Sequence, residues 1–295
     1  MTDADDALPH APLPAIDPAQ AIGVIVAFIR GQMAQAGFER LVIGLSGGVD
    51  SAAVAFLAAR AIGAENLLAV RMPYRTSSEA SETDAMRVVH ALGCATERVD
   101  ITPMVDPMLA LIDDADGGAD SGTLNVRRGN VMARQRMIVL YDRSVSWDAL
   151  VVGTSNKTEG LLGYGTLHGD MAAALSPIGD LYKTQLRAVA RELGVPEEVV
   201  AKPPSADLWP GQTDETEAGF SYPELDRLLF WRIDKRRSVE ELVALGFDAA
   251  TVKRVDRMVA TSEFKRQVPP IAKLGPRTAG VDYLYPRRRP GSARG

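Results

Sequence analysis

The sequence predicts an α/β fold, doubly wound, in which a mostly parallel sheet carries helices on both faces. Short apolar runs rich in branched residues alternate with segments of helical length along the first half of the chain. One apolar run ends in a Ser-Gly-Gly turn that leads directly into an Ala-rich helical segment. The 295 residues are 46% hydrophobic and 24% charged, which is ordinary for a soluble enzyme with a large core.

The first expected element is a helix over residues 17–35, since Asp17-Pro18 is typical of a helix start and Ile22, Ile25 and Val26 form an apolar stripe. Period-2 or continuous apolar runs predict strands, and 3.6-residue periodicity predicts helices. The elements expected after the first helix are a strand at 41–45, a helix at 51–61, a strand at 66–72, a helix at 78–92, a strand at 97–101, a helix at 125–141, a strand at 149–152, an amphipathic helix after Lys183, and helices at 222–230, 239–245 and 248–264.

The remaining segments set the domain boundaries. Residues 1–16 are expected to be a mobile leader, 17–275 a single domain and 276–295 a basic C-terminal tail. The segment 113–123 is rich in Asp, Gly and Ala and predicts a mobile loop. The segment 202–220 carries several Pro and Gly residues and is interpreted as a lid over the site.

The turn after the first strand carries the strongest chemical signal. Adjacent glycines, Gly47 and Gly48, let backbone N–H groups and the positive end of a helix surround an anion. Ser46 and Ser51 add hydroxyl donors, and Asp50 can hold a cation that offsets phosphate charge. A plain strand-to-helix turn is the alternative, but the serines and the aspartate together favour a pyrophosphate site. Neither a Walker motif nor a dinucleotide-binding motif accompanies this turn.

A second strand end has the same design. The run 151–158 passes from apolar residues to Gly and small polar residues, and Glu159 follows one turn later. Glu159 is a candidate partner for Asp50 around Mg²⁺, although Ser155 or Asn156 could instead form a helix cap with it. Lys183 precedes an amphipathic helix, where a cation opposes the helix dipole unless an anion is near. This favours a phosphate contact over a surface lysine.

Composition excludes several classes. The net charge of −5 gives no broad electrostatic reason to bind nucleic acid or a membrane surface, and the apolar runs are too short to span a bilayer. Cys94 is the only cysteine, so no intrachain disulfide is possible and a cytoplasmic location is expected. The three histidines are too scattered to predict a zinc site.

The Ser-Gly-Gly-Val-Asp-Ser string resembles the pyrophosphate loop of the N-type ATP pyrophosphatases. Gly129-Asn130-Val131-Met132-Ala133-Arg134-Gln135-Arg136-Met137 resembles a signature of the NAD synthetases, particularly the ammonia-dependent enzymes. The other matching blocks follow in that family's order, at 153–159, 163–166, 169–170, 181–183, 204–208, 212–215 and 265–269. The resemblance covers nearly the whole chain and implies an adenine nucleotide alpha hydrolase-like fold.

The resemblance implies ATP-dependent amidation of nicotinic acid adenine dinucleotide (deamido-NAD) to NAD. A carbon–nitrogen ligase of this kind forms an acyl-adenylate, releases AMP and pyrophosphate, and takes ammonia as nitrogen donor. ATP is then a co-substrate, Mg²⁺ the metal, and a homodimer the expected assembly. Carried over by position, Asp50, Glu159 and Lys183 are catalytic, and Asp50 and Glu159 hold the metal. The ATP contacts are Gly44, Leu45, Ser46, Gly47, Gly48, Val49, Asp50, Ser51, Thr154, Lys183 and Ser205, and the dinucleotide contacts are Asn130, Arg134, Asp170 and Lys265.

Four residues depart from the ammonia-dependent pattern: Val126 replaces an aromatic residue, Leu167 a lysine, Ala174 an aspartate and Phe264 a histidine. These departures concern the dinucleotide contacts and leave the ATP contacts unchanged. Cys94 lies late in a helical pattern, which is typical of a buried structural thiol and not of a glutaminase nucleophile. The expected nitrogen donor is therefore free ammonia or ammonia delivered by a separate glutaminase partner.

Two other functions are compatible with the cradle sequence alone. One is a different adenylating amidoligase or tRNA-thiolating enzyme of the same superfamily, although thiolation needs catalytic cysteines and a basic RNA-binding face. The other is a nucleotide-binding module without turnover. The joint presence of Asp50, Glu159 and Lys183 favours an enzyme.

Overall fold

The computed structural model describes residues 13–115, 121–203 and 220–278, in which a four-stranded parallel sheet has the order β3-β2-β1-β4. Its strands are β1 (Arg40–Gly44), β2 (Leu67–Arg71), β3 (Ala95–Arg98) and β4 (Ala149–Val151). Leu41 at the centre pairs with Leu67 on one side and Leu150 on the other. The parallel sheet predicted from the sequence is confirmed.

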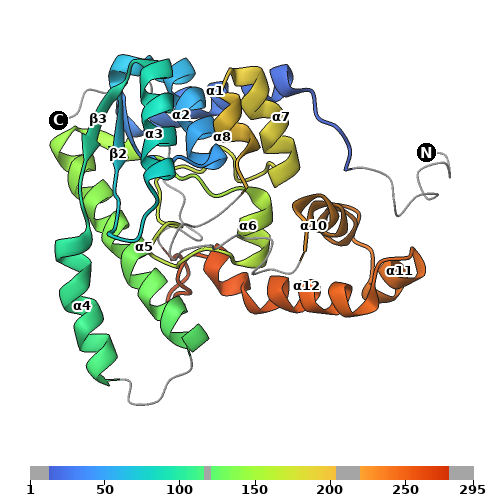
Figure 1. Ribbon diagram of the computed structural model, residues 1–295. Helices are drawn as coiled ribbons and strands as arrows, with labels where there is room; N and C mark the ends of the chain where they lie inside the picture. The colour runs from blue at the N-terminus through green and yellow to red at the C-terminus, as the bar shows by residue number, and fades with distance from the viewer. Residues whose placement is uncertain (1–12, 116–120, 204–219, 279–295) are drawn as a thin grey trace.

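Helices separate these strands and continue after them (Figure 1). The longer helices are α1 (Pro18–Ala36), α2 (Val49–Ile62), α3 (Glu79–Leu92), α4 (Thr102–Ala115), α5 (Ser121–Ser146), α7 (Lys183–Leu193), α10 (Tyr222–Leu229) and α12 (Ala249–Thr261). The shorter ones are η2 (Ala64–Asn66), α6 (Lys157–Leu162), α8 (Glu197–Ala201), η3 (Phe230–Asp234), α11 (Val239–Ala244) and η4 (Glu263–Arg266).

The two faces of the sheet carry separate hydrophobic cores. Side chains alternate along a strand, so Leu41 and Ile43 point to one face and Val42 to the other. The first face packs against α1, α2, α3 and α7, and the second against α4 and α5. In Figure 1 the α4 and α5 helices extend beyond the sheet. Coverage of both faces confirms the doubly wound architecture.

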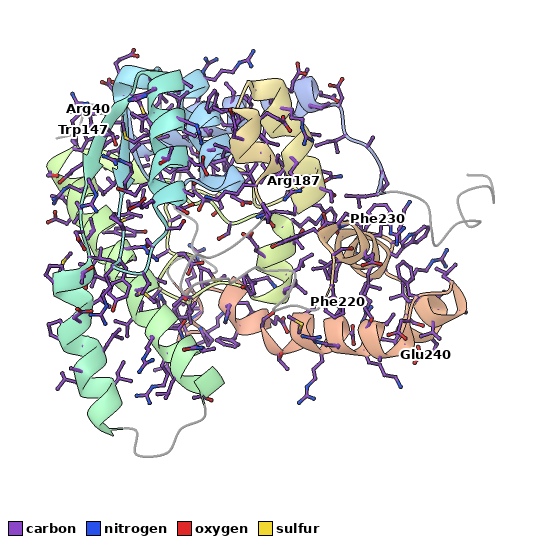
Figure 2. The ribbon with its side chains drawn as sticks, in the orientation of Figure 1. Arg40, Trp147, Arg187, Phe220, Phe230 and Glu240 are labelled. Carbon is purple, nitrogen blue, oxygen red and sulfur yellow. The ribbon has the colours of Figure 1, made fainter. Side chains whose placement is uncertain are left out.

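A third core joins α6 to the C-terminal helices α10, α11 and α12, through residues such as Leu162, Leu229 and Val252. Aromatic rings line it: Phe230 meets Trp231 edge to face at 5.9 Å. Figure 2 shows Phe220 and Phe230 in this region, well away from Arg40, whose guanidinium lies 5.3 Å from the Trp147 ring centroid. The C-terminal helices therefore form a distinct layer that contacts the sheet region through α6 and α7.

Three sequence expectations need correction in the region after β2. The third strand is Ala95–Arg98, and not 97–101, because Ile101 turns inward to pack with Val105, Leu109 and Ile112 of α4. The helix α4 was not predicted from the sequence, because Pro107 in its interior is a residue that normally breaks a helix. The expected loop at 113–123 is correspondingly shorter, since α4 runs to Ala115 and α5 begins at Ser121.

The N-terminal segment is described from Leu13 onward. Leu13 packs against the third core, Ile16 packs against the first, and the Pro14 carbonyl accepts a hydrogen bond of 3.2 Å from Gln185 Nε2. Residues 1–12 of the predicted leader lie outside the described part of the chain. So do residues 204–219 of the predicted lid and 279–295 of the predicted tail.

Candidate active site

A cavity of about 760 Å³ opens at the carboxyl ends of the central strands. Gly44 ends β1 and Leu45 follows it, Met72 follows β2, and Val152 and Gly153 follow β4. All of these residues line the cavity. In a doubly wound sheet, ligands bind at this end, where the connections from neighbouring strands diverge. The position of the cavity therefore agrees with the two strand-end motifs of the sequence.

The Ser-Gly-Gly turn forms a compact loop at the start of α2. Ser51 Oγ donates to the Gly48 carbonyl at 3.0 Å and lies 3.1 Å from Ser46 Oγ. Gly47 has φ = +80°, and a Cβ there would lie 2.2 Å from the carbonyl oxygen of Ser81, so only glycine fits. Gly48 caps α2 without a side chain, so the helix N-terminus has no capping side chain and its dipole favours an anion there.

Lys183 is the centre of the charged end of the cavity. Its side chain is 2% exposed, and its Nζ lies 2.5 Å from Asp50 Oδ2 and 3.0 Å from Glu159 Oε1. Burial alone would lower the pKa of Lys183, but the two carboxylates outweigh it and raise the pKa above its ordinary value. Lys183 is therefore a permanent cation, and its position at the start of α7 is compensated by adjacent anions.

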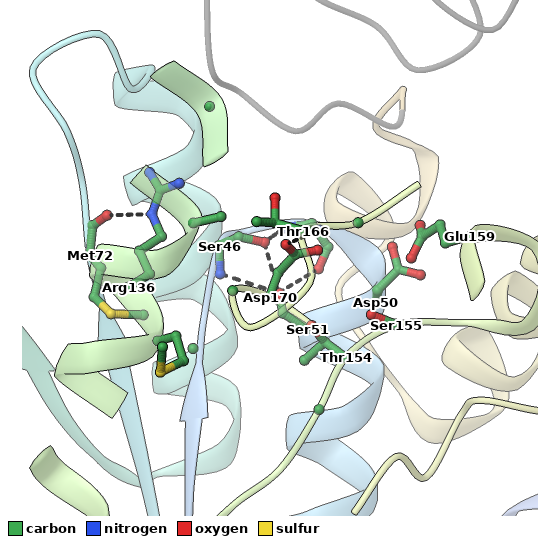
Figure 3. A pocket seen from close by; sticks show the side chains of 18 of the residues that line it. Ser46, Asp50, Ser51, Met72, Arg136, Thr154, Ser155, Glu159, Thr166 and Asp170 are labelled. Carbon is green, nitrogen blue, oxygen red and sulfur yellow. Dashed lines mark hydrogen bonds between the residues drawn. The ribbon is translucent and has the colours of Figure 1, made fainter. Parts of the chain in front are cut away.

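Asn156 connects the two strand-end motifs. Its amide Nδ2 donates to Asp50 Oδ1 at 2.7 Å, and its Oδ1 accepts from the Glu159 N–H at 3.0 Å. Asn156 and Glu159 form a reciprocal capping box at the start of α6. The capping interpretation of Glu159 and its place beside Asp50 are thus both observed. Figure 3 shows Asp50 and Glu159 facing one another across the cavity edge.

The Asp50–Glu159 pair has the donor set that Mg²⁺ uses beside phosphates. This metal binds proteins through one or two carboxylates and takes its other ligands from substrate and water. The two carboxylates already converge on one cation, the Lys183 ammonium, so they are arranged to hold positive charge. The described residues contain no group of three or more His, Cys, Asp or Glu suited to a metal. The two carboxylates by themselves fit a metal that takes its remaining ligands from phosphates and water.

The other end of the cavity is built by α5 and the 163–170 loop. Thr166 Oγ1 donates to Asn130 Oδ1 at 2.8 Å, and the Thr166 N–H donates to Asp170 Oδ1 at 2.8 Å. Lys265 Nζ donates to the carbonyls of Gly163 and Gly165, both at 2.8 Å. Asp170 is exposed to the cavity. Loss of surrounding water raises the pKa of its carboxyl, while hydrogen bonds from Thr166 lower it.

The structure brings together most of the residues singled out from the sequence. Asn130, Thr154, Glu159, Asp170, Lys183 and Lys265 line the cavity with most of the 44–51 segment. Arg134 does not: it is exposed, and its Nε donates to the Leu167 carbonyl at 3.4 Å. Ser205 lies outside the described residues. Of the four departures from the family pattern, Val126 alone lines the cavity.

Two cavity cations, Arg136 and Lys202, were not among the site residues predicted from the sequence. Asn156, which was predicted only as a possible helix cap, binds Asp50 directly. Arg136 Nε donates to the Met72 carbonyl at 3.1 Å (Figure 3). Lys202 Nζ binds Asp84 Oδ2 at 2.9 Å and Ser81 Oγ at 3.2 Å, on the helix that touches Gly47. These contacts join segments more than 60 residues apart, which local sequence patterns do not reveal.

Comparison with known proteins decides the family. A family model described as NAD synthase matches residues 21–269. The chain belongs to the NAD synthase family. It is 52% identical over 264 residues to a protein of Chlorobium phaeobacteroides (strain BS1) named NH(3)-dependent NAD(+) synthetase, covering 90% of this chain and 92% of that protein.

Solved structures of the family show the same fold. The NMN synthetase of Francisella tularensis superposes with a TM-score of 0.74 at 29% identity, over 87% of this chain and 99% of that one. The NH3-dependent NAD synthetase of Campylobacter jejuni, solved with a nitrate ion, gives 0.71 at 32% identity, over 88% and 100%. The described residues contain no helix with the length and apolarity needed to cross a membrane.

Proposed function

We propose that this NAD synthase family member converts nicotinic acid adenine dinucleotide to NAD, with ATP and ammonia as co-substrates. The observation that supports this most directly is the Asp50–Lys183–Glu159 group beside the Ser-Gly-Gly loop, at one end of a cavity that continues along α5. Such a group suits the splitting of ATP between its α and β phosphates. The remaining cavity length suits the dinucleotide.

The chemistry needs no nucleophile from the protein. A nicotinate carboxylate oxygen attacks the α-phosphorus, the bond to the β-phosphate oxygen breaks, and pyrophosphate leaves. Ammonia then attacks the acyl carbon, and AMP leaves as the nitrogen loses a proton. The residues contribute positioning and charge stabilisation. Backbone N–H groups at the start of α2 hold the leaving phosphates, and Lys183 offsets their charge.

We propose Asp50 and Glu159 as the protein ligands of Mg²⁺. When bound, Mg²⁺ neutralises charge on the phosphates and stabilises the departing pyrophosphate. Asn156 keeps the Asp50 carboxylate in place through its 2.7 Å hydrogen bond. Lys183 stays between the two carboxylates and limits their mutual repulsion. At the other end, we propose Asn130, Asp170 and Lys265 as the residues that receive the dinucleotide.

We also propose a homodimer formed through the exposed apolar face of α4 and α5. Met108, Leu111, Ile138 and Val145 on these helices are between 48% and 82% exposed. Val126 is 57% exposed and also lines the cavity, so a second copy on this face would cover the cavity edge. Sedimentation of the wild type and of Ile138→Glu tests this, since a charge on this apolar face should produce monomers. A monomeric wild type would contradict it.

A coupled assay tests the reaction. Pyrophosphate release and NAD formation are measured with nicotinic acid adenine dinucleotide, ATP, Mg²⁺ and either ammonia or glutamine. The expected result is equal NAD and pyrophosphate with ammonia, and little product with glutamine. A parallel reaction contains nicotinic acid mononucleotide, because one structural neighbour is named NMN synthetase. Turnover of the mononucleotide alone, or pyrophosphate release without an acyl acceptor, would contradict the proposed reaction.

A further inference from the structure

A buried carboxylate on α10 lies directly behind the charged end of the cavity. Asp226 is 0% exposed, and its two oxygens accept three hydrogen bonds. Oδ1 accepts from Thr158 Oγ1 at 2.6 Å, and Oδ2 accepts from the Thr184 N–H at 2.8 Å and from Thr184 Oγ1 at 2.7 Å. Burying a carboxylate is costly, so full hydrogen bonding is required for it to stay charged.

The partners of Asp226 are the immediate neighbours of two proposed catalytic residues. Thr158 precedes Glu159 on α6, and Thr184 follows Lys183 on α7. Thr158 Oγ1 also accepts a 3.1 Å hydrogen bond from the Lys183 N–H. A continuous chain of hydrogen bonds therefore runs from the Lys183 N–H through the Thr158 hydroxyl to Asp226. It ties α6 to α7 where their first turns carry Glu159 and Lys183.

Asp226 also adds an acceptor to the start of α7. The Tyr182 N–H, just before the helix, donates to Gln185 Oε1 at 3.1 Å, whereas the Thr184 N–H donates to Asp226. The first N–H groups of a helix have no partner inside it, and an anion there is favoured by the dipole. Asp226 provides that anion from a separate helix, and Tyr222 of the same helix lies with its ring centroid 5.2 Å from Lys183 Nζ.

We propose that Asp226 is a positioning residue for the reaction, fixing Lys183 and Glu159 relative to each other through Thr158 and Thr184. This rests on the proposed roles of Lys183 and Glu159. The C-terminal helical layer would then be part of the catalytic apparatus, although its residues other than Lys265 lie outside the cavity wall. Asp226 touches no substrate in this proposal. It acts only through the residues it holds.

The Asp226→Asn variant tests the proposal in the assay above. An amide has only one oxygen acceptor, so its NH₂ group must face Thr158 or Thr184, and at least one of the three bonds is lost. The expected result is a fall in kcat of about tenfold or more, or about 1.4 kcal/mol of transition-state stabilisation. The Mg²⁺ concentration for half-maximal rate should also rise, because Glu159 shifts away from Asp50.

Asp256→Asn is the matched control. Asp256 lies on α12 in the same helical layer, and its Oδ1 accepts from Arg232 Nε at 2.6 Å. Within the described residues, Asp256 makes no hydrogen bond or ion pair to α6 or α7. Its loss should lower the melting temperature and leave kcat and the Mg²⁺ requirement unchanged. The proposal is overturned if Asp226→Asn behaves in the same way, with lower stability alone.

Thr158 provides a second test if Asp226→Asn does not fold. Thr158→Val removes the hydroxyl with little change in shape, so both the Lys183 N–H and Asp226 Oδ1 lose a partner. Thr158→Ser keeps the hydroxyl and should restore the rate and the Mg²⁺ requirement. Equal kcat for the Thr158→Val and Thr158→Ser variants would overturn the proposed positioning role of Asp226. Wild-type enzyme that makes no NAD would instead contradict the proposed function and leave nothing for Asp226 to position.

Discussion

The two ends of the cavity are built by different means. At the charged end, which we propose binds the ATP phosphates and call the phosphate end, Ser46 to Ser51 form one continuous segment that includes the first residues of α2. Lys183 is buried there between two carboxylates. At the opposite end, polar side chains of α5 and the C-terminal helices bind the 163–170 loop, as Asn130 does with Thr166 and Lys265 with the Gly163 and Gly165 carbonyls. The phosphate end is thus fixed by buried charge and backbone, and the other by contacts between separate surfaces. We expect mutations at the phosphate end to affect ATP binding and chemistry, and those at the other end to affect affinity for the dinucleotide.

The largest effect is expected for Asp50→Asn. The substitution removes one of the two charges around Lys183 and a proposed Mg²⁺ ligand, while the amide oxygen can still accept from Asn156. Pyrophosphate release should fall about a thousandfold or more, with unchanged circular dichroism. Asp106→Asn, which loses an exposed ion pair with Arg75, is the control and should be fully active. Normal turnover by Asp50→Asn would refute the metal assignment.

The next effect concerns the loop backbone. Gly47→Ala places a Cβ 2.2 Å from the Ser81 carbonyl oxygen and strains a residue with φ = +80°. We expect a loss of about 2–3 kcal/mol in unfolding free energy and a higher KM for ATP. Gly93→Ala, at φ = +67° with open space around the Cβ, should cost about 1 kcal/mol and leave KM unchanged. Equal effects of the two substitutions in denaturant titrations and ATP kinetics would show that the loop tolerates a side chain.

A smaller effect is expected at the other end of the cavity. Lys265→Met removes the charged donor from the Gly163 and Gly165 carbonyls, of which Gly163 keeps the Gly165 N–H at 3.0 Å. A hydrogen bond to a charged group contributes about 1.5–3 kcal/mol. The KM for the dinucleotide should rise about tenfold, and the KM for ATP should not change. Lys253→Met, on the exposed face of α12, serves as the control. A rise in the KM for ATP instead would mean that the two ends are not independent.

The smallest effect is a pH dependence at Asp170. Because its pKa is raised in the folded protein, the native state keeps this proton to a higher pH than the unfolded chain does. Asp170 ionisation therefore lowers stability as pH rises from about 3.8, its unfolded pKa, through the raised native pKa. Asp170→Asn should melt higher than wild type above that window, with the difference vanishing below it. A constant difference at every pH, measured by thermal unfolding, would contradict this.

The phosphate end was also the part best predicted from the sequence, because many of its residues lie in one short segment. The strand, the two glycines and Asp50 are contiguous, and the parallel sheet follows from alternating strands and helices. Glu159 was also predicted at the same edge of the sheet, because the carboxyl ends of parallel strands lie together. Lys183 was predicted from one local signal, a cation at a helix start, which is unfavourable unless an anion is near.

Long-range contacts were beyond sequence reasoning. Arg134 and Arg136 share one helical motif, but only the packing of α5 on the sheet decides that Arg136 faces the cavity and Arg134 does not. Nothing near Asp226 in the sequence marks it as the partner of Thr158, 68 residues earlier. The strand at 95–98 was misplaced because Ile101 resembles a strand residue, although it lies directly before α4 and packs with the core residues of that helix.

The burial of Lys183 between two acids has a consequence for the form in which the nucleotide enters. Two carboxylates and one ammonium leave this corner with an excess of one negative charge. We expect a bare polyphosphate to bind poorly there, whereas a chelated one would bring the missing positive charge with it. The proposed phosphate site should therefore favour metal-complexed over free nucleotide, and excess uncomplexed ATP should be a poor competitor.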